Sequence, residues 1–387
     1  MRRCLLICFA LLFACGAGCV HSKNLDEYAY VLNIGAEPGT TMPYRVTFLV
    51  SVPGGGTEDT TVKNAVLSAE ARTFSEAAET LNAAYPGRLS LSRASMLVLH
   101  EDLVKTGAQT AFLDFAFGKP DLYENLRVAV VKGPIRDVFE GVISEADPSL
   151  RKIKTAVGEL SRKSGLTADV GYSAYLEAVE DDRFDAMLAY AGVNEWTLSP
   201  DLVGDGAYPY VGGALLIESP LKTSTAGSAV FDGDRMVGVL DGQHTMSVLM
   251  VTDAFRRGER MFTLPDGRAL VVTLYRVKAP RIELSGNTAS VRLFLEADLL
   301  DPKTVPMDSA SFKAYLSAAL EADLSAVLEA LQRVGSDAMG FGRFAAKQFS
   351  RVKDWETYDW KARYRSLSVT FSVSVGLAHD PRGSGLE

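Results

Sequence analysis

Cysteine is confined to the start of this chain, and the rest of the sequence contains none. The 387 residues include four cysteines, which are Cys4, Cys8, Cys15 and Cys19. A body without cysteine cannot form a disulfide framework, a thiolate metal site or a cysteine nucleophile. The sequence therefore excludes disulfide scaffolds, thiolate zinc sites and cysteine hydrolases for everything that follows residue 19.

Histidine and the common catalytic motifs are also scarce. The histidines at positions 21, 100, 244 and 379 never lie three or four residues apart, the spacing that places two metal ligands on one helix face. The chain has no G-x-S-x-G elbow and no Walker lysine, and the glycine pair around Phe341 lacks the third glycine of a dinucleotide loop. We therefore expect no catalytic residue, no cofactor and no metal site, which weighs against a secreted hydrolase.

A positive net charge and long apolar runs are missing as well. Lysine and arginine number 40 against 48 aspartates and glutamates, which gives a net charge of −8 and argues against a nucleic-acid partner. After the N-terminus no stretch approaches about 18 consecutive apolar residues, so we expect no internal transmembrane helix. The acidic group Glu177, Glu180, Asp181 and Asp182 is more typical of a solvated helix face than of a cation site.

Residues 1–18 have the layout of an export signal. Arg2 and Arg3 precede an apolar stretch at Leu5–Phe13, and small residues follow it. Small residues directly before a cysteine are typical of a bacterial lipobox, in which that cysteine is lipidated and becomes the first residue. Cys19 is the preferred lipidation site, Cys15 is the alternative, and an unlipidated signal peptide is the third reading. Two acyl chains would hold the mature protein at a membrane surface without spanning it.

The pattern after the signal predicts an α+β protein. We expect mixed α/β domains in which largely antiparallel sheets are flanked by helices, because strand-like and helix-like segments are interspersed along the chain. A segment rich in proline, glycine and aspartate after residue 198 suggests a linker between the first two domains. The three expected domains are an N-terminal α/β domain at residues 19–198, a mostly β middle domain at 199–280, and a C-terminal domain at 281–387 with long helices packed on a sheet.

Local patterns predict the elements of the first two domains. Alternating apolar residues indicate strands within residues 28–52, and an amphipathic pattern indicates a helix over Ser75–Ala84. Residues 149–190 are expected to be helical, with a break near Gly171. In the middle domain, the Asp-Gly pair at position 232 separates two strand-like segments and predicts a hairpin, because this pair tolerates the positive φ of a tight turn. A second Asp-Gly turn is expected at position 266, within Leu264–Val272.

The C-terminal domain has the cleanest helical periodicity. Ser309 is expected to cap a long helix that ends at Gly335. Its apolar residues recur every three or four positions, and they are Phe312, Tyr315, Leu316, Ala319, Leu320, Leu324, Val327, Leu328 and Leu331. Ser336 is expected to cap a second helix that runs to about Phe349. Strict alternation over residues 366–375 predicts a strand with one buried face.

Several short blocks follow one another in a recognisable order. They are Asn33-Ile34-Gly35 after the lipobox cysteine, Arg72–Ala77 at the start of the first helix, Leu91–Val104, Gly227–Phe231 with Arg235–Gly238, and a closing block with Leu331-Gln332, Ser336-Asp337, Gly340–Arg343, Trp355 and Trp360. The closing block is the most specific. In this order the chain resembles the Ger(x)C family of spore germination lipoproteins, the C subunits of nutrient-germinant receptors.

The resemblance implies a fold of three α/β domains, no catalytic residue and no cofactor. It also implies a lipid-anchored subunit on the extracytoplasmic face of the spore inner membrane, which acts in germination by assembling with integral A-type and B-type membrane subunits. Phe341, Trp355 and Trp360 are candidate contacts with these partners. The two tryptophans are either exposed contact residues, because interfaces favour aromatic residues, or part of the core. The alternative is a lipid-anchored extracytoplasmic solute-binding module with a small ligand between its domains.

Overall fold

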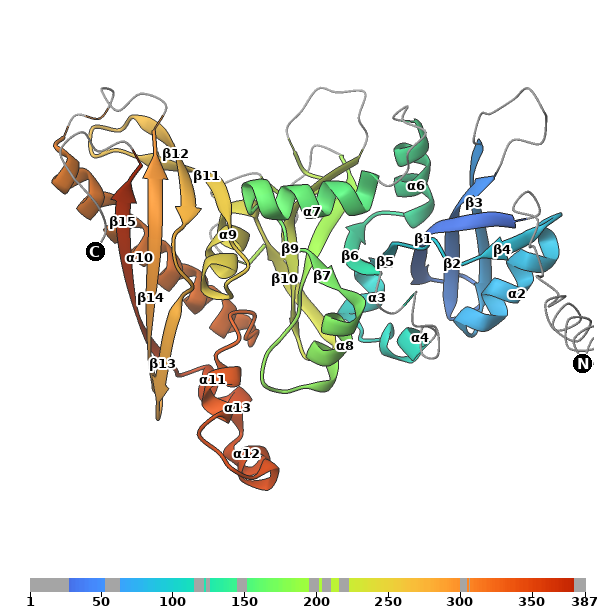
Figure 1. The fold of residues 1–387 in the computed structure, drawn as a ribbon. Coiled ribbons are helices and arrows are strands. Elements are labelled where there is room, and N and C mark those ends of the chain that lie inside the picture. The colour runs from blue at the N-terminus through green and yellow to red at the C-terminus, as the bar shows by residue number, and fades with distance from the viewer. Residues whose placement is uncertain are drawn as a thin grey trace, which may run out of the picture.

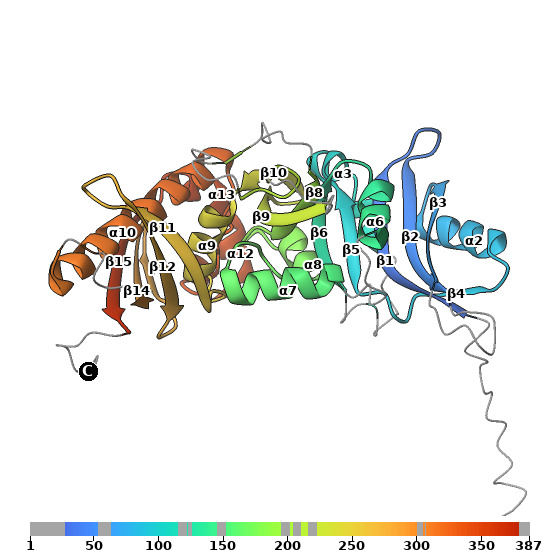
Figure 2. The ribbon, with the colours of Figure 1, turned by 90° about the horizontal axis from the view of Figure 1, so that it is seen from above.

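The computed structural model describes residues 28–52, 63–114, 122, 126–144, 152–194, 202–203, 210–215, 223–299, 305 and 307–378. These residues form an elongated body, with the N-terminal strands at one end and the C-terminal sheet at the other (Figures 1 and 2). The expected signal peptide at residues 1–18, with Cys15 and the neighbouring Cys19, lies outside the described residues.

The first of two sheets mixes parallel and antiparallel pairs. Its strands are β1 (Tyr28–Pro38), β2 (Tyr44–Val52), β3 (Lys63–Ala71), β4 (Arg88–Ser90), β5 (Met96–His100), β6 (Arg127–Lys132), β7 (Val170–Gly171), β8 (Met187–Val193), β9 (Thr223–Asp232) and β10 (Arg235–Leu240). Their order is β10-β9-β8-β6-β5-β1-β2-β3, while β4 pairs with β1 and β7 with β6. The strands expected within residues 28–52 are confirmed as β1 and β2, an antiparallel pair.

The second sheet belongs to the C-terminal half. Its strands are β11 (Arg257–Thr263), β12 (Ala269–Arg276), β13 (Arg281–Ser285), β14 (Thr288–Asp298) and β15 (Ser368–Leu377). The order is β11-β12-β14-β13, and β15 pairs in parallel with β14. The hairpin expected at Asp232-Gly233 is confirmed as β9–β10, and the Asp-Gly turn expected at position 266 joins the antiparallel strands β11 and β12. The alternation of β15 is confirmed too, because Phe371, Val373 and Val375 are buried.

Helices cover the first sheet and connect its parallel strands. They are α2 (Phe74–Ala84), α3 (Glu101–Lys105), α4 (Thr110–Leu113), α6 (Ile135–Ser144), α7 (Lys152–Ser164) and α8 (Tyr172–Glu180). The amphipathic helix predicted from Ser75 is confirmed as α2. It begins after Thr73, whose hydroxyl accepts a hydrogen bond from the backbone N–H of Glu76, and it buries Phe74, Ala77 and Leu81.

The long C-terminal helix is confirmed as α10 (Ser309–Val334), which packs against β15. Its cap is Asp308 rather than the predicted Ser309, because the Asp308 carboxylate accepts the backbone N–H groups of Ala310 and Ser311. Gly335 ends the helix at φ 82°, a left-handed conformation that glycine adopts without strain. Most of the predicted apolar stripe is buried, whereas Tyr315 and Ala319 are only partly covered.

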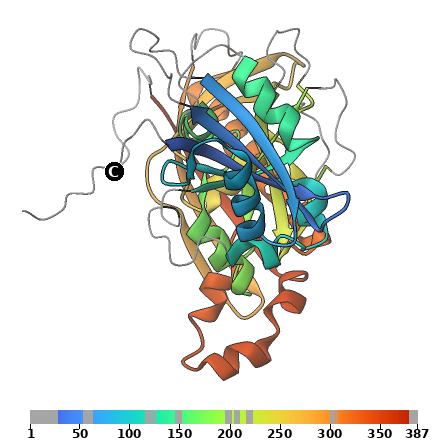
Figure 3. The ribbon, with the colours of Figure 1, turned by 90° about the vertical axis from the view of Figure 1, so that its right-hand side faces the viewer.

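The prediction of a second helix over Ser336–Phe349, directly after α10, is wrong. Only α11 (Gly342–Ala346) is helical there, followed by α12 (Val352–Tyr358) and α13 (Trp360–Tyr364). The physical reason is a turn, since Gly340 has φ 73° and the buried side chain of Asp337 binds the backbone of residues 341 and 342. These short helices project from one side of the molecule (Figures 1 and 3).

The prediction of helix over residues 149–190 is also wrong at its end. Helices α7 and α8 are present, but residues 187–190 belong to β8. Because β8 lies between β6 and β9 and is buried along most of its length, its apolar run has no alternation and resembles a buried helix.

The mixture of sheets and helices confirms the α+β fold class, while the three-domain division stays a prediction. Strands of the expected middle domain, residues 199–280, are shared between the sheets: β9 and β10 extend the first, and β11 and β12 begin the second. Within the described ranges, no helix is long and apolar enough to cross a membrane.

Candidate functional site

Asp337 is the centre of a buried polar junction that follows α10. Its Oδ1 accepts a hydrogen bond from the backbone N–H of Phe341 at 2.9 Å. Its Oδ2 accepts the backbone N–H of Gly342 at 2.8 Å and the indole N–H of Trp360 at 3.0 Å. One fully buried carboxylate therefore fixes the turn before α11 and the first residue of α13.

Asp185 extends this junction to the first sheet. Its carboxylate accepts the backbone N–H groups of Asp337 and Gly233, at 2.6 and 2.7 Å. It also accepts the ammonium group of Lys361 at 2.6 Å, and that ammonium donates to Asp232 at 2.7 Å. The β9–β10 turn, the loop after α8 and α13 are thus tied together by charge-assisted hydrogen bonds.

The buried position of these groups changes their pKa values. Burial raises the pKa of Asp337 to about 7, although the N–H groups of Gly342, Phe341 and Trp360 favour the charged form. Burial works against the charge of Lys361, but the two neighbouring aspartates outweigh it and raise the pKa of the ammonium. Lys361 therefore stays cationic and balances the carboxylates around it.

The three aromatic residues predicted as partner contacts lie around this junction. Phe341, Trp360 and Trp355 are only 0%, 2% and 8% exposed, so the two tryptophans belong to the core, the second of the two alternatives. The rings of Trp355 and Trp360 lie 6.3 Å apart, and both carry a hydrogen-bonded indole N–H. Burial of large aromatic surface accounts for all three residues, and their contact with a partner stays a prediction.

Gly342 lies where two neighbouring segments approach closely. A Cβ atom at this position would lie 2.4 Å from the carbonyl oxygen of Arg183 and 2.5 Å from the indole nitrogen of Trp360. No larger residue fits without displacing the backbone, so glycine is needed here for packing.

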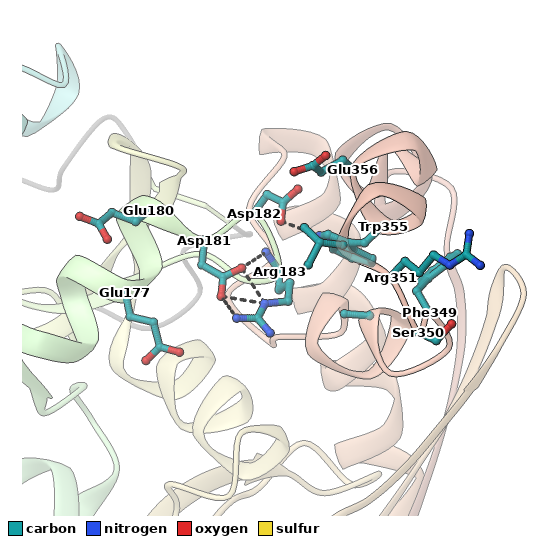
Figure 4. Close-up of a pocket in the computed structure, with 12 residues that line it drawn as sticks. Glu177, Glu180, Asp181, Asp182, Arg183, Phe349, Ser350, Arg351, Trp355 and Glu356 are labelled. Carbon is teal, nitrogen blue, oxygen red and sulfur yellow. Dashed lines mark hydrogen bonds and ion pairs between the residues drawn. The ribbon is translucent and has the colours of Figure 1, made fainter.

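A groove of about 860 Å³ opens beside the junction, between the end of α8 and the segment α11–α12 (Figure 4). One wall carries the acidic group that the sequence singled out, together with Arg183. The opposite wall belongs to α11, α12 and their connection. It contains Ala346, Phe349, Ser350, Arg351, Val352, Trp355 and Glu356.

Two of the acidic side chains in the groove already have partners. Asp181 binds the guanidinium group of Arg183, with Nε 2.7 and 2.8 Å from the two carboxylate oxygens. Despite partial burial, these hydrogen bonds hold the pKa of Asp181 below its usual value. Asp182 accepts the indole N–H of Trp355 at 2.7 Å. The expectation of a plain solvated helix face is therefore too simple, because part of this group binds the opposite wall.

The described residues contain no group of three or more His, Cys, Asp or Glu side chains that could hold a metal ion. His244 is buried in α9 (Gly242–Val251) beside Asp241, with Nδ1 and Oδ2 2.8 Å apart. His100 accepts the backbone N–H of Asp102 at the start of α3. His21 and His379 lie outside the described residues.

Sequence reasoning missed the roles of Asp185 and Lys361. Neither residue stands out in the sequence, because each is one of many charged residues in a polar stretch. The signal for Asp337 was its position in the closing block, just before a glycine pair.

Comparison with known proteins identifies both halves of the chain. Residues 21–193 match the family described as "Spore germination protein N-terminal domain", and residues 226–379 match "Spore germination B3/ GerAC like, C-terminal". Spore germination protein GerQC of Bacillus cereus is 19% identical over 388 residues, covering 97% of this chain and 98% of that protein. The crystal structure of the GerBC protein has a TM-score of 0.51 and 12% identity, and the match covers 89% of this chain and 97% of that one.

The matching halves define this chain as a protein of the spore germination class. It belongs to the Ger(x)C family, as the order of its sequence blocks indicated. The likeness to GerBC is a likeness of fold, and it agrees with the mixed α/β architecture described above.

Proposed function

We propose that this chain is the C subunit of a spore nutrient-germinant receptor and acts in germination without catalysing a reaction. The observation that carries the proposal is the coverage of the chain by the two spore germination domains, at residues 21–193 and 226–379. The similarity to GerQC supports it, because the match covers 97% of this chain and 98% of that protein.

In this proposal the protein is a lipid-anchored partner of integral membrane subunits. Cys19, with Cys15 as the alternative, carries the lipid on the extracytoplasmic face of the spore inner membrane. Two acyl chains supply stable anchoring. The receptor also contains an A-type and a B-type integral subunit, which supply the membrane-spanning part.

A non-catalytic role agrees with the chemistry of the described polar clusters. The carboxylates of Asp185 and Asp337 are occupied by backbone N–H groups, Lys361 and Trp360. Ser247 donates to Asp323, which also binds Arg260. Because these side chains satisfy one another, they serve to hold elements of the fold together.

Co-purification from spores tests the proposal. The full chain, tagged at its C-terminus, is isolated from detergent-solubilised spore inner membranes, and an untagged strain is the control. We expect a multi-spanning membrane protein to accompany the tagged chain in constant ratio. Recovery of the chain alone would contradict the receptor role and favour the solute-binding alternative.

A further inference from the structure

Helix α9 carries buried polar side chains at the place where the two sheets meet. The helix follows β10 of the first sheet and precedes β11 of the second, and it lies between the sheets in Figures 1 and 2. All ten of its residues are buried, and one of them is His244. A titratable side chain therefore lies inside the contact between the sheets.

Both ring nitrogens of His244 face carboxylates. Nδ1 lies 2.8 Å from Oδ2 of Asp241, the residue that caps α9. On the other side of the ring, Nε2 lies 4.0 Å from Oδ1 of Asp323 on α10. A neutral imidazole has a single N–H, so its other nitrogen would present a lone pair to a carboxylate. Both contacts are favourable only when both nitrogens carry hydrogen, which is the charged form of the ring.

The charges around His244 favour the same form. Asp323 also binds Arg260 on β11, with Nη2 2.5 Å from Oδ1, and it accepts the hydroxyl of Ser247. Two largely buried carboxylates thus share one guanidinium group, and a charged imidazole balances the remaining negative charge. Burial by itself works against a charged ring, whereas the two adjacent carboxylates favour it.

The other elements around α9 direct their charged side chains elsewhere. Strands β9, β10 and β14 pack against the helix. Asp232 and Arg235 lie at the β9–β10 turn, at the far end of the hairpin from α9. On α10, Glu321 accepts the backbone N–H of Val373 on β15. The charged residues of β14 alternate with its buried ones and lie on the outer face of the sheet, and they are Arg292, Glu296 and Asp298.

We propose that His244 is a proton-dependent latch between the two sheets. In its charged form the ring bridges Asp241, at the start of α9, to Asp323 on α10, and it thereby fixes the end of the first sheet against the helix that packs on the second. Loss of the proton leaves the two carboxylates with Arg260 alone and weakens the contact between α9 and α10. The inference concerns the fold itself and does not depend on the receptor role.

The direction of the pH dependence follows from the charged form. The folded state binds the proton of His244 more tightly than the unfolded chain, in which histidine is half protonated near about pH 6.5. The stabilising contribution of His244 is therefore complete below about pH 6.5 and is lost as the pH rises above this value. Asp337 also titrates in this range, so the effect of His244 is measured as a difference between two proteins that both keep Asp337.

Nuclear magnetic resonance of the imidazole nitrogens tests the charged form directly. The purified full chain carries nitrogen-15 histidine, and His244→Gln identifies the signals of His244 among those of the four histidines. At pH 7 we expect both nitrogens of His244 to carry hydrogen, and at pH 10 only one. A ring with one bare nitrogen at pH 6 would overturn the proposal, and so would a ring that is still charged at pH 10.

Urea denaturation of the full chain tests the effect on stability. Between pH 6 and pH 9, the unfolding equilibrium constant of the wild type should rise about tenfold more than that of His244→Gln, because glutamine cannot bind a proton. The matched control is His100→Gln. Nδ1 of His100 accepts the backbone N–H of Asp102, a contact that an uncharged ring makes, so this variant should keep the wild-type pH profile. Parallel profiles for the wild type and His244→Gln would contradict the latch.

Hydrogen exchange locates the change within the fold. After correction for intrinsic rates, amide exchange in peptides from α9 and from α10 around Asp323 should be faster at pH 9 than at pH 6 in the wild type. In His244→Gln it should be equally fast at both pH values. Peptides from α2 are the internal reference, and an equal increase there would show general loosening and no latch.

A second variant keeps the test decisive if His244→Gln does not fold. Asp323→Asn removes one of the two carboxylates and keeps a side chain that can hydrogen-bond to Ser247. In this variant the loss of the His244 proton, followed by nuclear magnetic resonance, should move to lower pH than in the wild type. An unchanged titration of His244 would show that Asp323 does not hold the proton, which overturns the bridge between α9 and α10.

Discussion

Asp337 shows how much of this fold depends on one buried carboxylate. Replacing it with alanine leaves the N–H groups of Phe341, Gly342 and Trp360 buried without an acceptor. We expect Asp337→Ala to lower the free energy of unfolding by about 3 to 5 kcal/mol. Urea denaturation of the purified chain measures this, with the exposed Glu79→Ala as a control that changes the free energy of unfolding by less than about 0.5 kcal/mol. A loss as small as that of the control would contradict the role of the junction.

The same carboxyl group should make stability depend on pH. Its pKa is about 7 in the folded protein against a usual value of 3.8, so the folded state binds the proton more tightly. The contribution of Asp337 to stability is therefore greatest below about pH 4 and is lost as the pH rises through about 7. We expect the wild type to lose more stability than Asp337→Asn between pH 5 and pH 8. Equal losses in the two proteins would refute this prediction.

Gly342 provides a steric test next to the same junction. We expect Gly342→Ala to destabilise the protein by about 2 kcal/mol or more, because its Cβ would overlap the carbonyl of Arg183. Gly158→Ala, inside α7, is the matched control. Its nearest neighbouring atom lies 3.5 Å from the new Cβ, and alanine favours helix, so its melting temperature should be unchanged or higher. Similar melting temperatures for both variants would argue against close packing at Gly342.

At the scale of single elements, amphipathic patterns correctly predict the helices and strands that have one solvent-exposed face and one buried face. Helices α2 and α10 and strand β15 follow their predicted periodicity for that reason. Helix α9 was not predicted, because all ten of its residues are buried and no apolar stripe distinguishes one face. The segment of strand β8 is predicted as helix for the same reason, because it too is buried on both faces. Burial on every side removes the signal on which such predictions rely.

The site was harder to predict than the elements. Phe341, Trp355 and Trp360 were identified as important by their place in the closing block, yet sequence alone does not distinguish a buried aromatic residue from an exposed one. The groove brings together residues 177–183 and 346–356, which are far apart in the chain. Only the fold places them side by side.

The start of α10 offers a test of one element boundary. Because Asp308 and not Ser309 caps the helix, Asp308→Ala should cost about 1 kcal/mol of stability, whereas Ser309→Ala should have little effect. The N–H and hydroxyl groups of Ser311 hold the pKa of Asp308 below its usual value, so the cap is charged at neutral pH. Chemical denaturation of both variants measures the difference. If Ser309→Ala were instead the less stable variant, Ser309 would be the cap, as predicted from the sequence.

At the scale of the whole molecule, the first question is what holds the protein at the membrane. We expect Cys19→Ala to move the protein from the membrane fraction to the soluble fraction of disrupted spores, while Cys15→Ala stays bound. Immunoblotting of the two fractions measures this. Release of Cys15→Ala alone would assign the lipid to Cys15. If both single variants and the double variant stayed in the membrane fraction, contacts with other membrane proteins would be enough to hold the protein there.

The pairing of β8 with β9 has a consequence for how this protein can be divided. The N-terminal family match ends at residue 193, the last residue of β8, and the C-terminal match begins at residue 226, inside β9. A truncated protein that stops at the first boundary would expose β8 as an unprotected apolar edge, which invites aggregation. The boundary between the two family matches therefore falls within one sheet, and we expect expression of the two halves as separate polypeptides to yield folded protein only when both are made together.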